Sequence, residues 1–537
     1  MKKFYFFYCL LLLSFISLLF PELLYSGNGK ISGRVTDSQT NEPLIGVTVM
    51  IDTVWVSGHP YAQNPKLGAV TNENGYFAIL NVPPGFYNVK ASMVGYSTYT
   101  KAKVQVDADR TITLNIKLTP SSVQMDAIVV TYEREVIKPD VASTQEVIQT
   151  ARIAEVPIVR VDEFVGNLKG IELVDNNEGH GLSVRGGAIR ETDIRIEGIS
   201  LQDPRSENSY LSLNSTTIQE LQVLTGGFQA KYGGIQSGLL NVVTKEGNRD
   251  KYNFALKVDI TPTAKKKFFG TDPYSNESPI YQVFAGKYAM NGIKTKEDSL
   301  AVPPEFWGFK GWNDPSTGNY PDLPKDAKLT PEQKLQLWKL RHPQYSYGKK
   351  PDIYIETSLS GPLPGGELPL LGEYFRNTTF LLGFKYENSQ FAFPVGPRDS
   401  YIDWNTQLKL TSVLSPNMRL SVDGMYAKIS SLNEGSATNY GGTLVDPSSS
   451  FNFISNSEPS VKRQAALIGS DNFYRMFNKS RLQYYDQRYI IGGVKFTHTL
   501  SASSFYTVNL HFGYTDHELR PFSLDTTKPD AWITIGG

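Results

Sequence analysis

Residues able to perform chemistry are few and scattered in this sequence. Its only cysteine is Cys9, and its six histidines are dispersed, with His59 isolated in a loop-like stretch. A catalytic thiol or a zinc site needs several such groups together. The sequence also lacks HExxH, P-loop and G-x-S-x-G motifs. We therefore expect no enzymatic activity, no metal site and no cofactor.

Two polar features are candidate ligand contacts. Asp175–Gly179 carries carboxylate and amide groups that suit a cation, although a polar turn explains the same residues more simply. Arg190 and Arg205 suit an anionic ligand, and structural ion pairs explain them at least as well. Neither feature defines a site by itself.

Charge and hydropathy narrow the class of protein. The chain has 53 Lys and Arg residues and 53 Asp and Glu residues in 537, so no net field favours nucleic acid. After the N-terminal segment, no uninterrupted apolar stretch has the length of a membrane helix. If the chain enters a membrane there, it must do so as a closed barrel, which satisfies the backbone hydrogen bonds in lipid.

Residues 1–26 have the pattern of a secretory signal peptide. Met1–Lys3 carries positive charge, Phe4–Phe20 is largely apolar, and Leu24–Ser26 offers a cleavage site. A single membrane anchor is the alternative for this run. Cleavage would remove Cys9 and leave an exported chain without disulfides or a reactive thiol. Such a chain suits a bacterial envelope.

Residues 29–119 consist of short β-forming segments, such as GVTVMI and GYFAIL, separated by turn residues. This spacing predicts a small β-sandwich. The segments GRVTD, PLIGVTVMI and TNENGYFAILNVPPGFYNVKASMVGY resemble the carboxypeptidase regulatory-like (transthyretin-like) domain. The resemblance covers nearly the whole region and implies a module without catalytic activity.

Residues 138–247 mix helical and β patterns. Val161, Phe164, Val165 and Leu168 follow helical spacing, and Gly170 is placed to end that helix. SVRGG, IRIEG and the glycine-rich segment 218–245 resemble, in order and spacing, the plug domain of TonB-dependent outer-membrane receptors. Glu197 stands where that family usually has Asp and keeps the carboxylate. The resemblance assigns the plug motif to Arg185, Gly186, Gly187, Glu197, Gly198, Gly226, Gly227, Tyr232, Gly233, Gly238, Asn241, Thr244 and Lys245.

The linker of residues 120–137 carries a β-forming run, Ile128–Val130, followed by charged residues. An exposed run of this kind invites aggregation unless something pairs with it. The segment resembles the TonB box of the same receptors, which implies strand pairing with TonB. The residues concerned are Asp126, Ala127, Ile128, Val129, Val130 and Thr131. A last strand of the sandwich or a first strand of the plug is the alternative.

Residues 251–537 alternate between apolar and polar side chains. Leu408 and Leu410 alternate with Gln407 and Lys409, and the aromatic segment 506–514 repeats the pattern. One apolar and one polar face suit the wall of an outer-membrane barrel, although a soluble sandwich alternates in the same way. Short and long links take turns along this region, which favours the barrel. We therefore expect the first part of an antiparallel transmembrane β-barrel.

We expect this barrel to be incomplete in the sequence. The region contains about seven strands, whereas bacterial barrels have an even number and receptors of this type have about 22. The chain also ends without the terminal aromatic residue of the receptors it resembles. Within the first long link, Thr330, Pro331 and Gln333 predict the start of a helix with a capping box.

The sequence thus predicts a mainly β chain with a β-sandwich, a small α/β plug domain and part of a barrel. The resemblance implies a receptor of the cell outer membrane, with the N-terminal domain in the periplasm. It implies energised uptake of a scarce nutrient, in which the plug gates the barrel. The expected partners are TonB with its inner-membrane energising complex, outer-membrane lipid and an unknown small ligand. A surface-binding or signalling receptor without transport is the alternative, and a periplasmic scaffold is a third.

Overall fold

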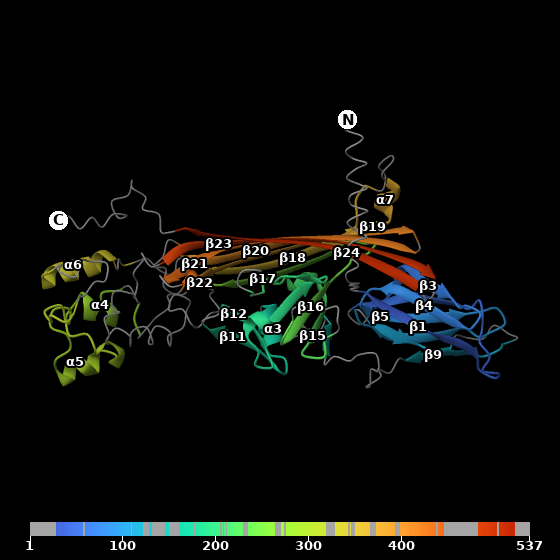
Figure 1. Ribbon diagram of the computed structural model, residues 1–537, viewed down its shortest axis with the longest axis horizontal. Coiled ribbons are helices and arrows are strands. Elements are labelled where there is room, and N and C mark those ends of the chain that lie inside the picture. Colours follow the sequence, from blue (N-terminus) through green and yellow to red (C-terminus); the bar gives the residue numbers. More distant parts are fainter. Residues whose placement is uncertain are drawn as a thin grey trace, which may run out of the picture.

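The computed structural model consists of two β-sheet units and a small α/β domain between them, with a helical insert (Figure 1). It describes residues 28–520 except 57–58, 109, 122–127, 132–144, 150–159, 177–178, 204–206, 208, 211, 229–234, 264–269, 273–274, 318–327, 342–343, 345–349, 366–371, 392–397, 416, 437–438, 445–481 and 502–503. The predicted signal peptide and residues 126–127 of the predicted TonB box lie outside the described residues. Among the described residues, no helix is long and apolar enough to cross a membrane.

The N-terminal region is a sandwich of two sheets, as the alternating segments predicted, and we call this unit the sandwich. One sheet has the order β4-β1-β7 with β8 also paired to β1, and the other has the order β3-β2-β5-β6-β9. Inward side chains such as Ile31, Val49 and Phe77 form its core. The strands are β1 Gly29–Asp37, β2 Thr48–Val56, β3 His59–Val70, β4 Tyr76–Val82, β5 Gly85–Ser92, β6 Tyr99–Val106, β7 Thr111–Thr113, β8 Ile116–Leu118 and β9 Ile128–Thr131.

The α/β domain comes next along the chain. Its sheet has the order β10-β15-β16-β13-β14, and β11 and β12 form a separate hairpin. This hairpin pairs Asn176 with Gly179, so the described residues of the polar segment Asp175–Gly179 are the ends of two paired strands, and residues 177–178 lie outside the described residues. The elements are β10 Gln145–Gln149, α3 Val161–Gly166, β11 Ile171–Asn176, β12 Gly179–Val184, the 3-10 helix η1 Ile189–Glu191, β13 Thr192–Ile196, β14 Ile199–Ser200, η2 Ser215–Thr217, β15 Ile218–Leu224 and β16 Gly238–Thr244.

The predicted helix in this domain is shorter than its apolar spacing suggests. Helix α3 ends at Gly166, and the N–H groups of Asn167 and Leu168 bond back only three residues, to Phe164 and Val165. Such tightened bonds are common where an α-helix ends. Gly170 lies beyond the helix in a turn with φ +79°.

The C-terminal region is one antiparallel sheet, which we call the large sheet. Its order is β17-β18-β19-β20-β21-β23-β24, with β22 also paired to β21, and within the described residues β17 and β24 are its two edges. Two links are tight, since Ser415 pairs with Met418 and Ser501 pairs with Ser504. The strands are β17 Asn253–Thr261, β18 Asp352–Pro362, β19 Thr378–Gln390, β20 Ser400–Ser415, β21 Met418–Ser436, β22 Asn439–Leu444, β23 Leu482–Ser501 and β24 Ser504–Arg520, and the short helix α7 Gly372–Arg376 precedes β19.

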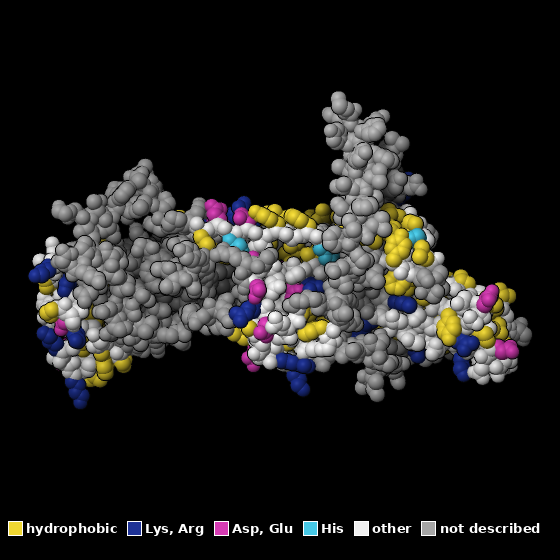
Figure 2. All heavy atoms as spheres, viewed as in Figure 1, with side chains coloured by type: hydrophobic (Ala, Val, Ile, Leu, Met, Phe, Trp, Pro, Cys, Tyr) yellow, Lys and Arg dark blue, Asp and Glu magenta, His cyan; other side chains and the backbone are white. Residues whose placement is uncertain are grey.

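The large sheet exposes its apolar face and buries its polar face, the reverse of the arrangement in a soluble protein. On β19, Leu382 is 43% exposed and Phe384 37%, whereas the neighbouring Lys385 is 1% exposed. Leu510 and Phe512 on β24 are likewise exposed, and yellow hydrophobic side chains appear along this side of the molecule in Figure 2. Polar side chains therefore face the α/β domain and apolar ones face outward. The predicted mainly β fold, with its sandwich, α/β domain and membrane-type antiparallel sheet, is confirmed.

The long link between β17 and β18 folds into a helical insert with its own aromatic core. Trp312 and Trp338 are buried there beside Phe284 and Phe306. The capping box is confirmed, because the Gln333 N–H donates to Thr330 Oγ1 at 3.3 Å and the Thr330 N–H donates to Gln333 Oε1 at 2.9 Å. The insert contains α4 Pro279–Phe284, α5 Lys296–Ala301, the 3-10 helix η3 Pro304–Phe306 and α6 Pro331–Arg341.

The sandwich and the insert lie at opposite ends of the large sheet (Figure 1). The Lys251 Nζ atom, just before β17, lies 4.0 Å from the centre of the Tyr61 ring in the sandwich. Arg419, next to the tight turn between β20 and β21, donates to the Asn81 carbonyl of the sandwich at 3.3 Å. The sandwich therefore shares its end of the sheet with a tight turn, and the insert shares the other end with long links.

Candidate functional site

The IRIEG segment forms a two-residue hairpin turn between β13 and β14. Ile196 pairs with Ile199, and both residues between them have positive φ, +54° at Glu197 and +87° at Gly198. A type I′ turn requires this geometry, and glycine adopts it without steric cost. The turn brings the Glu197 carboxylate to the surface of the domain that faces the large sheet.

Glu197 makes a buried ion pair across the boundary between the α/β domain and the large sheet. Its Oε1 accepts from Lys409 Nζ on β20 at 2.7 Å. The same oxygen accepts from the Thr244 N–H at 2.8 Å and from Thr244 Oγ1 at 2.6 Å. The side chains of Glu197 and Lys409 are 8% and 4% exposed, so water screens the pair weakly.

The surroundings keep Glu197 ionised. Burial by itself raises the pKa of the Glu197 carboxyl, but the positive charges of Lys409 and Lys495 lower it. Hydrogen bonds from Lys409 and Thr244 lower it further, so that the pKa falls from 4.5 to about 2. A carboxylate in this state at neutral pH holds the domain on the sheet by charge as well as by hydrogen bonds.

A second ion pair links all three units. Glu246, just after β16, pairs with Arg419 on β21, and this pairing holds the pKa of Glu246 below its usual value despite burial. Arg419 also donates to the Asn81 carbonyl of the sandwich at 3.3 Å. Burial, with a smaller contribution from Glu246, raises the pKa of the nearby Tyr87 hydroxyl in the sandwich.

The segment Asn214–Thr217 attaches the α/β domain to three strands of the large sheet. The Asn214 side chain donates to the carbonyls of Thr357 at 3.2 Å and Phe384 at 3.1 Å. The Ser215 N–H donates to Glu356 Oε1 at 2.9 Å, and Thr217 Oγ1 donates to Gln407 Oε1 at 3.2 Å. Backbone carbonyls occur at regular intervals along a strand whatever its side chains are. The bonds of Asn214 therefore depend on where the two strands lie and not on which side chains they carry.

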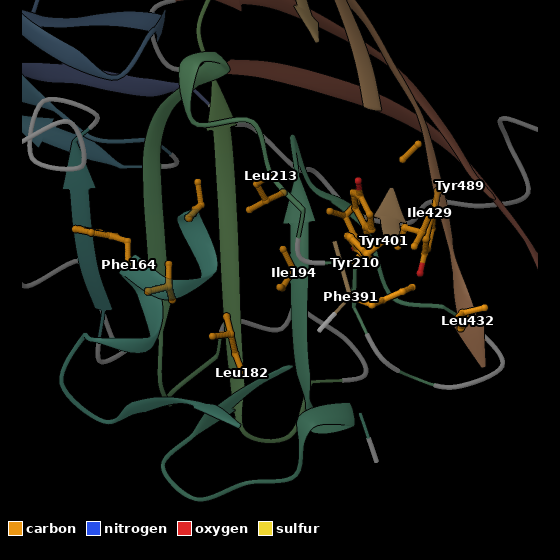
Figure 3. Close-up of a cluster of buried hydrophobic side chains, with 14 of the residues drawn as sticks. Phe164, Leu182, Ile194, Tyr210, Leu213, Phe391, Tyr401, Ile429, Leu432 and Tyr489 are labelled. Atoms are coloured by element: carbon orange, nitrogen blue, oxygen red, sulfur yellow. The ribbon is translucent and has the colours of Figure 1, made fainter. Parts of the chain in front are cut away.

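Aromatic packing extends the contact. Figure 3 shows Tyr210 of the α/β domain pointing among Tyr401, Ile429 and Tyr489 of the large sheet. The Tyr210 and Tyr489 rings lie 4.9 Å apart, and the Tyr210 hydroxyl donates to Asp403 Oδ1 at 2.9 Å. The domain and the sheet thus share one buried cluster and are not merely adjacent.

The structure brings some of the predicted plug residues together and leaves others apart. Glu197 and Thr244 meet, and Lys245 Nζ donates to the Thr216 carbonyl at 2.8 Å. Asn241 donates to Gln222 Oε1 at 3.1 Å inside the domain. Gly238 packs so closely on Val184 that an added Cβ would lie 2.4 Å from it.

The remaining plug-motif residues have conformational roles or are not described. Arg185 and Gly186 form a turn with φ +51° and +77°, and Gly187 accepts from Ser183 Oγ at 2.8 Å. Gly226 and Gly227 follow β15 in a loop, where Gly227 has φ +66°. Tyr232 and Gly233 lie outside the described residues.

The sequence placed Lys409 on the polar face of its strand, but it did not identify Lys409, Arg419 or Asn214 as contacts between the domains. Lys409 and Arg419 carried a usable signal, because an ionised side chain on the inward face of a membrane-type strand needs a partner. Asn214 carried no such signal. Across the described residues, no group of three His, Cys, Asp or Glu side chains is arranged to hold a metal ion.

The predicted TonB-box segment lies against the sandwich. Strand β9 pairs in parallel with β6, with Tyr99 opposite Ile128 and Ala102 opposite Thr131. This pairing is the arrangement expected of a last sandwich strand. Pairing with TonB through the same residues stays a prediction.

Comparisons with known proteins agree with this domain order. The family model described as CarboxypepD_reg-like domain matches residues 31–130, and the model described as TonB-dependent Receptor Plug Domain matches residues 138–238. The first match therefore extends through Ile128–Val130 of β9. The chain contains a CarboxypepD_reg-like domain followed by the plug domain of TonB-dependent receptors, and the α/β domain is called the plug from here on.

One curated relative is the TonB-dependent transporter Oar of Myxococcus xanthus. It is 23% identical over 241 residues, which are 43% of this chain and 22% of Oar. The chain therefore spans about a fifth of the length of this relative. The matched domains and the relative are those of receptors and transporters, which are outer-membrane proteins, and not those of enzymes.

Solved receptors give weaker matches. The siderophore receptor PirA from Pseudomonas aeruginosa is 10% identical, with a TM-score of 0.37 over 70% of this chain and 41% of that chain. The ferric citrate transporter FecA in the unliganded form is 10% identical, with a TM-score of 0.39 over 71% of this chain and 41% of that chain.

Replacing Glu197 by Gln is expected to weaken the attachment of the plug. The variant removes the carboxylate that is bonded to the buried Lys409, while the charge of Glu246 still acts on this lysine, so we expect a loss of up to about 3–5 kcal/mol. Thermal unfolding of the purified protein and limited proteolysis of the plug measure the loss. Glu197→Asp, which keeps the charge, is expected to lose less, and Glu207→Gln at an exposed plug glutamate is the control. Equal stability of Glu197→Gln and Glu207→Gln would contradict this role of the ion pair.

The stabilisation by Glu197 is expected to depend on pH. Because the folded pKa is lowered to about 2, the carboxylate stabilises fully above its usual pKa of 4.5 and ceases to do so as pH falls toward 2. The stability difference between the native chain and Glu197→Gln should therefore be largest near neutral pH and shrink at about pH 3. Melting curves of both proteins across this range test it, and a difference that grows on acidification would contradict it.

Proposed function

We propose that this chain belongs to a TonB-dependent outer-membrane receptor that takes up a scarce nutrient with energy supplied through TonB. The plug gates the barrel, and the segment Asp126–Thr131 pairs with TonB. The outer membrane has no ATP and no ion gradient of its own, so the work must come from the inner membrane. Strand pairing suits that task, because main-chain hydrogen bonds form along the pulled segment.

The observation that carries the proposal is the position of the plug on the polar face of the large sheet. Lys385, Asp403 and Gln407 would be costly on a wall in lipid unless they faced protein or water. Here they face the plug, and Tyr210 and Thr217 bond to two of them. The attachment combines these polar contacts with the aromatic contact of Tyr210 and Tyr489, and the polar contacts can be exchanged for water when a plug moves.

A surface-binding or signalling receptor without transport is the second candidate. Both candidates bind a ligand on the outer side, and they differ in whether the ligand enters the cell. The compound to follow is the one that co-purifies with the full-length protein, identified by mass spectrometry. Accumulation inside cells favours transport, and surface binding alone favours signalling.

Replacing Val129 by Pro is expected to abolish uptake and leave surface binding intact. Proline removes a strand N–H and fixes φ, so TonB pairing should fail, and we expect accumulation to fall at least about tenfold. The control is Val94→Pro in the sandwich, at the second position of the Met93–Tyr96 turn, where Gly95 has φ +87°. Proline is favoured at this position of a type II turn. Unchanged uptake in Val129→Pro would refute the assignment of this segment.

The N-terminal sandwich is expected in the periplasm and the helical insert at the cell surface. Leu300 on α5 is 83% exposed and Val94 in the sandwich is 98% exposed. Leu300→Cys should react in intact cells with a maleimide too large to cross the outer membrane, and Val94→Cys should react only after the membrane is permeabilised. The native chain, whose only cysteine is Cys9, is the unlabelled control. The reverse pattern of labelling would overturn this orientation.

A further inference from the structure

Strand β9 has one of its two edges occupied within the chain. It is the last strand of the sheet β3-β2-β5-β6-β9, and its four residues pair in parallel with Tyr99–Ala102 of β6. Strand pairing with TonB would use the same backbone groups if it took place on this edge. The sandwich therefore either presents β9 to TonB or withholds it.

We propose that the sandwich withholds β9 from TonB, and that TonB binds only after β9 has left β6. This inference rests on the proposed function and adds a regulatory role for the N-terminal domain. Three observations support it: the pairing itself, the attachment of the sandwich to the plug and the large sheet, and the path that a pulling force would take.

The pairing covers an edge on each of the two strands, β6 and β9. A β-forming run in a linker is prone to unwanted pairing, and so is an uncovered edge of a sandwich. In the β6–β9 pair, one edge of β9 and the Tyr99–Ala102 part of the edge of β6 cover each other. A resting receptor therefore keeps the run ordered without a bound partner.

The sandwich is attached to the plug by buried hydrogen bonds. The Ala108 N–H donates to Glu220 Oε1 at 3.1 Å, and Gln222 Nε2 donates to the Ala108 carbonyl at 2.8 Å. Glu220 is fully buried, so these bonds are shielded from water. Gln219 Nε2 adds a bond to the Pro84 carbonyl at 3.1 Å.

The sandwich is also attached to the large sheet. Arg419 on β21 donates to the Asn81 carbonyl while it pairs with Glu246, and Lys251 lies over the Tyr61 ring. The sandwich is thus held to the part of the molecule that would form the membrane-embedded wall. It is not a freely suspended module.

These attachments determine where a pull on β9 would act. While β9 remains in the sheet, tension on it acts on the sandwich. It is then shared with the large sheet through Asn81 and Arg419, and with the plug through Ala108. Once β9 leaves β6, the same tension runs along the chain to the plug, whose first described strand begins at Gln145. Release directs the tension along the chain to the first described strand of the plug instead of spreading it over the three units, which is why we infer release and not addition of a further strand to β9.

The cost of release is modest, because the pairing spans four residues on one edge. Each backbone hydrogen bond contributes little net free energy in water. The effect on TonB is a lowered apparent affinity, in proportion to the fraction of molecules in which β9 is free. Locking β9 onto β6 should therefore weaken binding, and freeing it should restore binding.

A disulfide across β6 and β9 tests the inference in the full-length protein. Thr100 and Val129 are opposite each other, and residues paired in register lie within the Cα separation that a disulfide spans. The variant is Thr100→Cys with Val129→Cys, in a chain whose only cysteine, Cys9, lies in the predicted signal peptide. The probe is the purified periplasmic domain of TonB from the same organism. We expect the oxidised variant to bind it at least about tenfold more weakly than the same protein after reduction.

The matched control uses the same position on β6. Lys90 on β5 pairs with Thr100, so a disulfide in Lys90→Cys with Thr100→Cys joins β5 to β6. Strand β9 can still leave β6 in this variant. Its TonB affinity should not change between the oxidised and reduced forms. A second test pair, Ala102→Cys with Thr131→Cys, covers the case in which the change at Val129 itself weakens binding.

The outcomes separate the two proposals. If the test pairs do not oxidise while the control pair does, β9 does not lie on β6 and the inference is wrong. Equal affinity of the oxidised and reduced test pairs shows that TonB does not need the covered edge, which also overturns it. If the control variant, whose β9 residues are native, does not bind TonB in either form, the proposed function is wrong and this inference falls with it.

Discussion

A sheet with an apolar outer face must satisfy the polar groups on its inner face, and the rest of this structure depends on that constraint. Lys385, Lys409 and Asp403 are nearly inaccessible to solvent. Charged groups in such a place are costly unless they are paired and hydrogen-bonded. The plug supplies Glu197 for Lys409, Tyr210 for Asp403 and Ser212 for Lys385. Within the sheet, Lys385 and Asp403 also pair with each other at 3.7 Å.

The same constraint explains the local geometry of the plug. A two-residue turn with two positive φ values places Glu197 at the tip of the hairpin β13–β14, within reach of β20. The Asn214–Thr217 segment bonds to backbone carbonyls of the sheet as well as to side chains. The plug is therefore held by directional hydrogen bonds and a buried ion pair as well as by the aromatic packing around Tyr210.

Arg419 connects the sandwich to these contacts between the plug and the large sheet. This residue bonds to Glu246 after the plug and to Asn81 in the sandwich, while Glu220 and Gln222 join the plug to Ala108. The three units therefore share polar contacts around the end of the sheet that carries the tight turns. These contacts give an event at the sandwich a physical route to the plug.

Much of the fold was predictable from residue patterns, because side-chain periodicity is a local property. Alternation assigned the strands of residues 251–520 and their outward faces, and the Thr330 capping box located the start of α6. The end of α3 was predicted less accurately, because Leu168 keeps the apolar spacing although the α-helix has already ended at Gly166. The partners of inward charges were not predictable, because periodicity says which face Lys409 occupies but not that Glu197 lies opposite.

The sequence by itself determined that Ile128–Val130 is a β-forming run and that Lys409 lies on the polar face of its strand. Each of these follows from the chemistry of a residue and its immediate neighbours. Only the tertiary structure decided that β9 pairs with β6 and that Arg419 meets both Glu246 and Asn81. The reason is that backbone hydrogen-bonding groups are the same at every residue, so a short strand pairs with whichever uncovered edge the folded domains bring beside it.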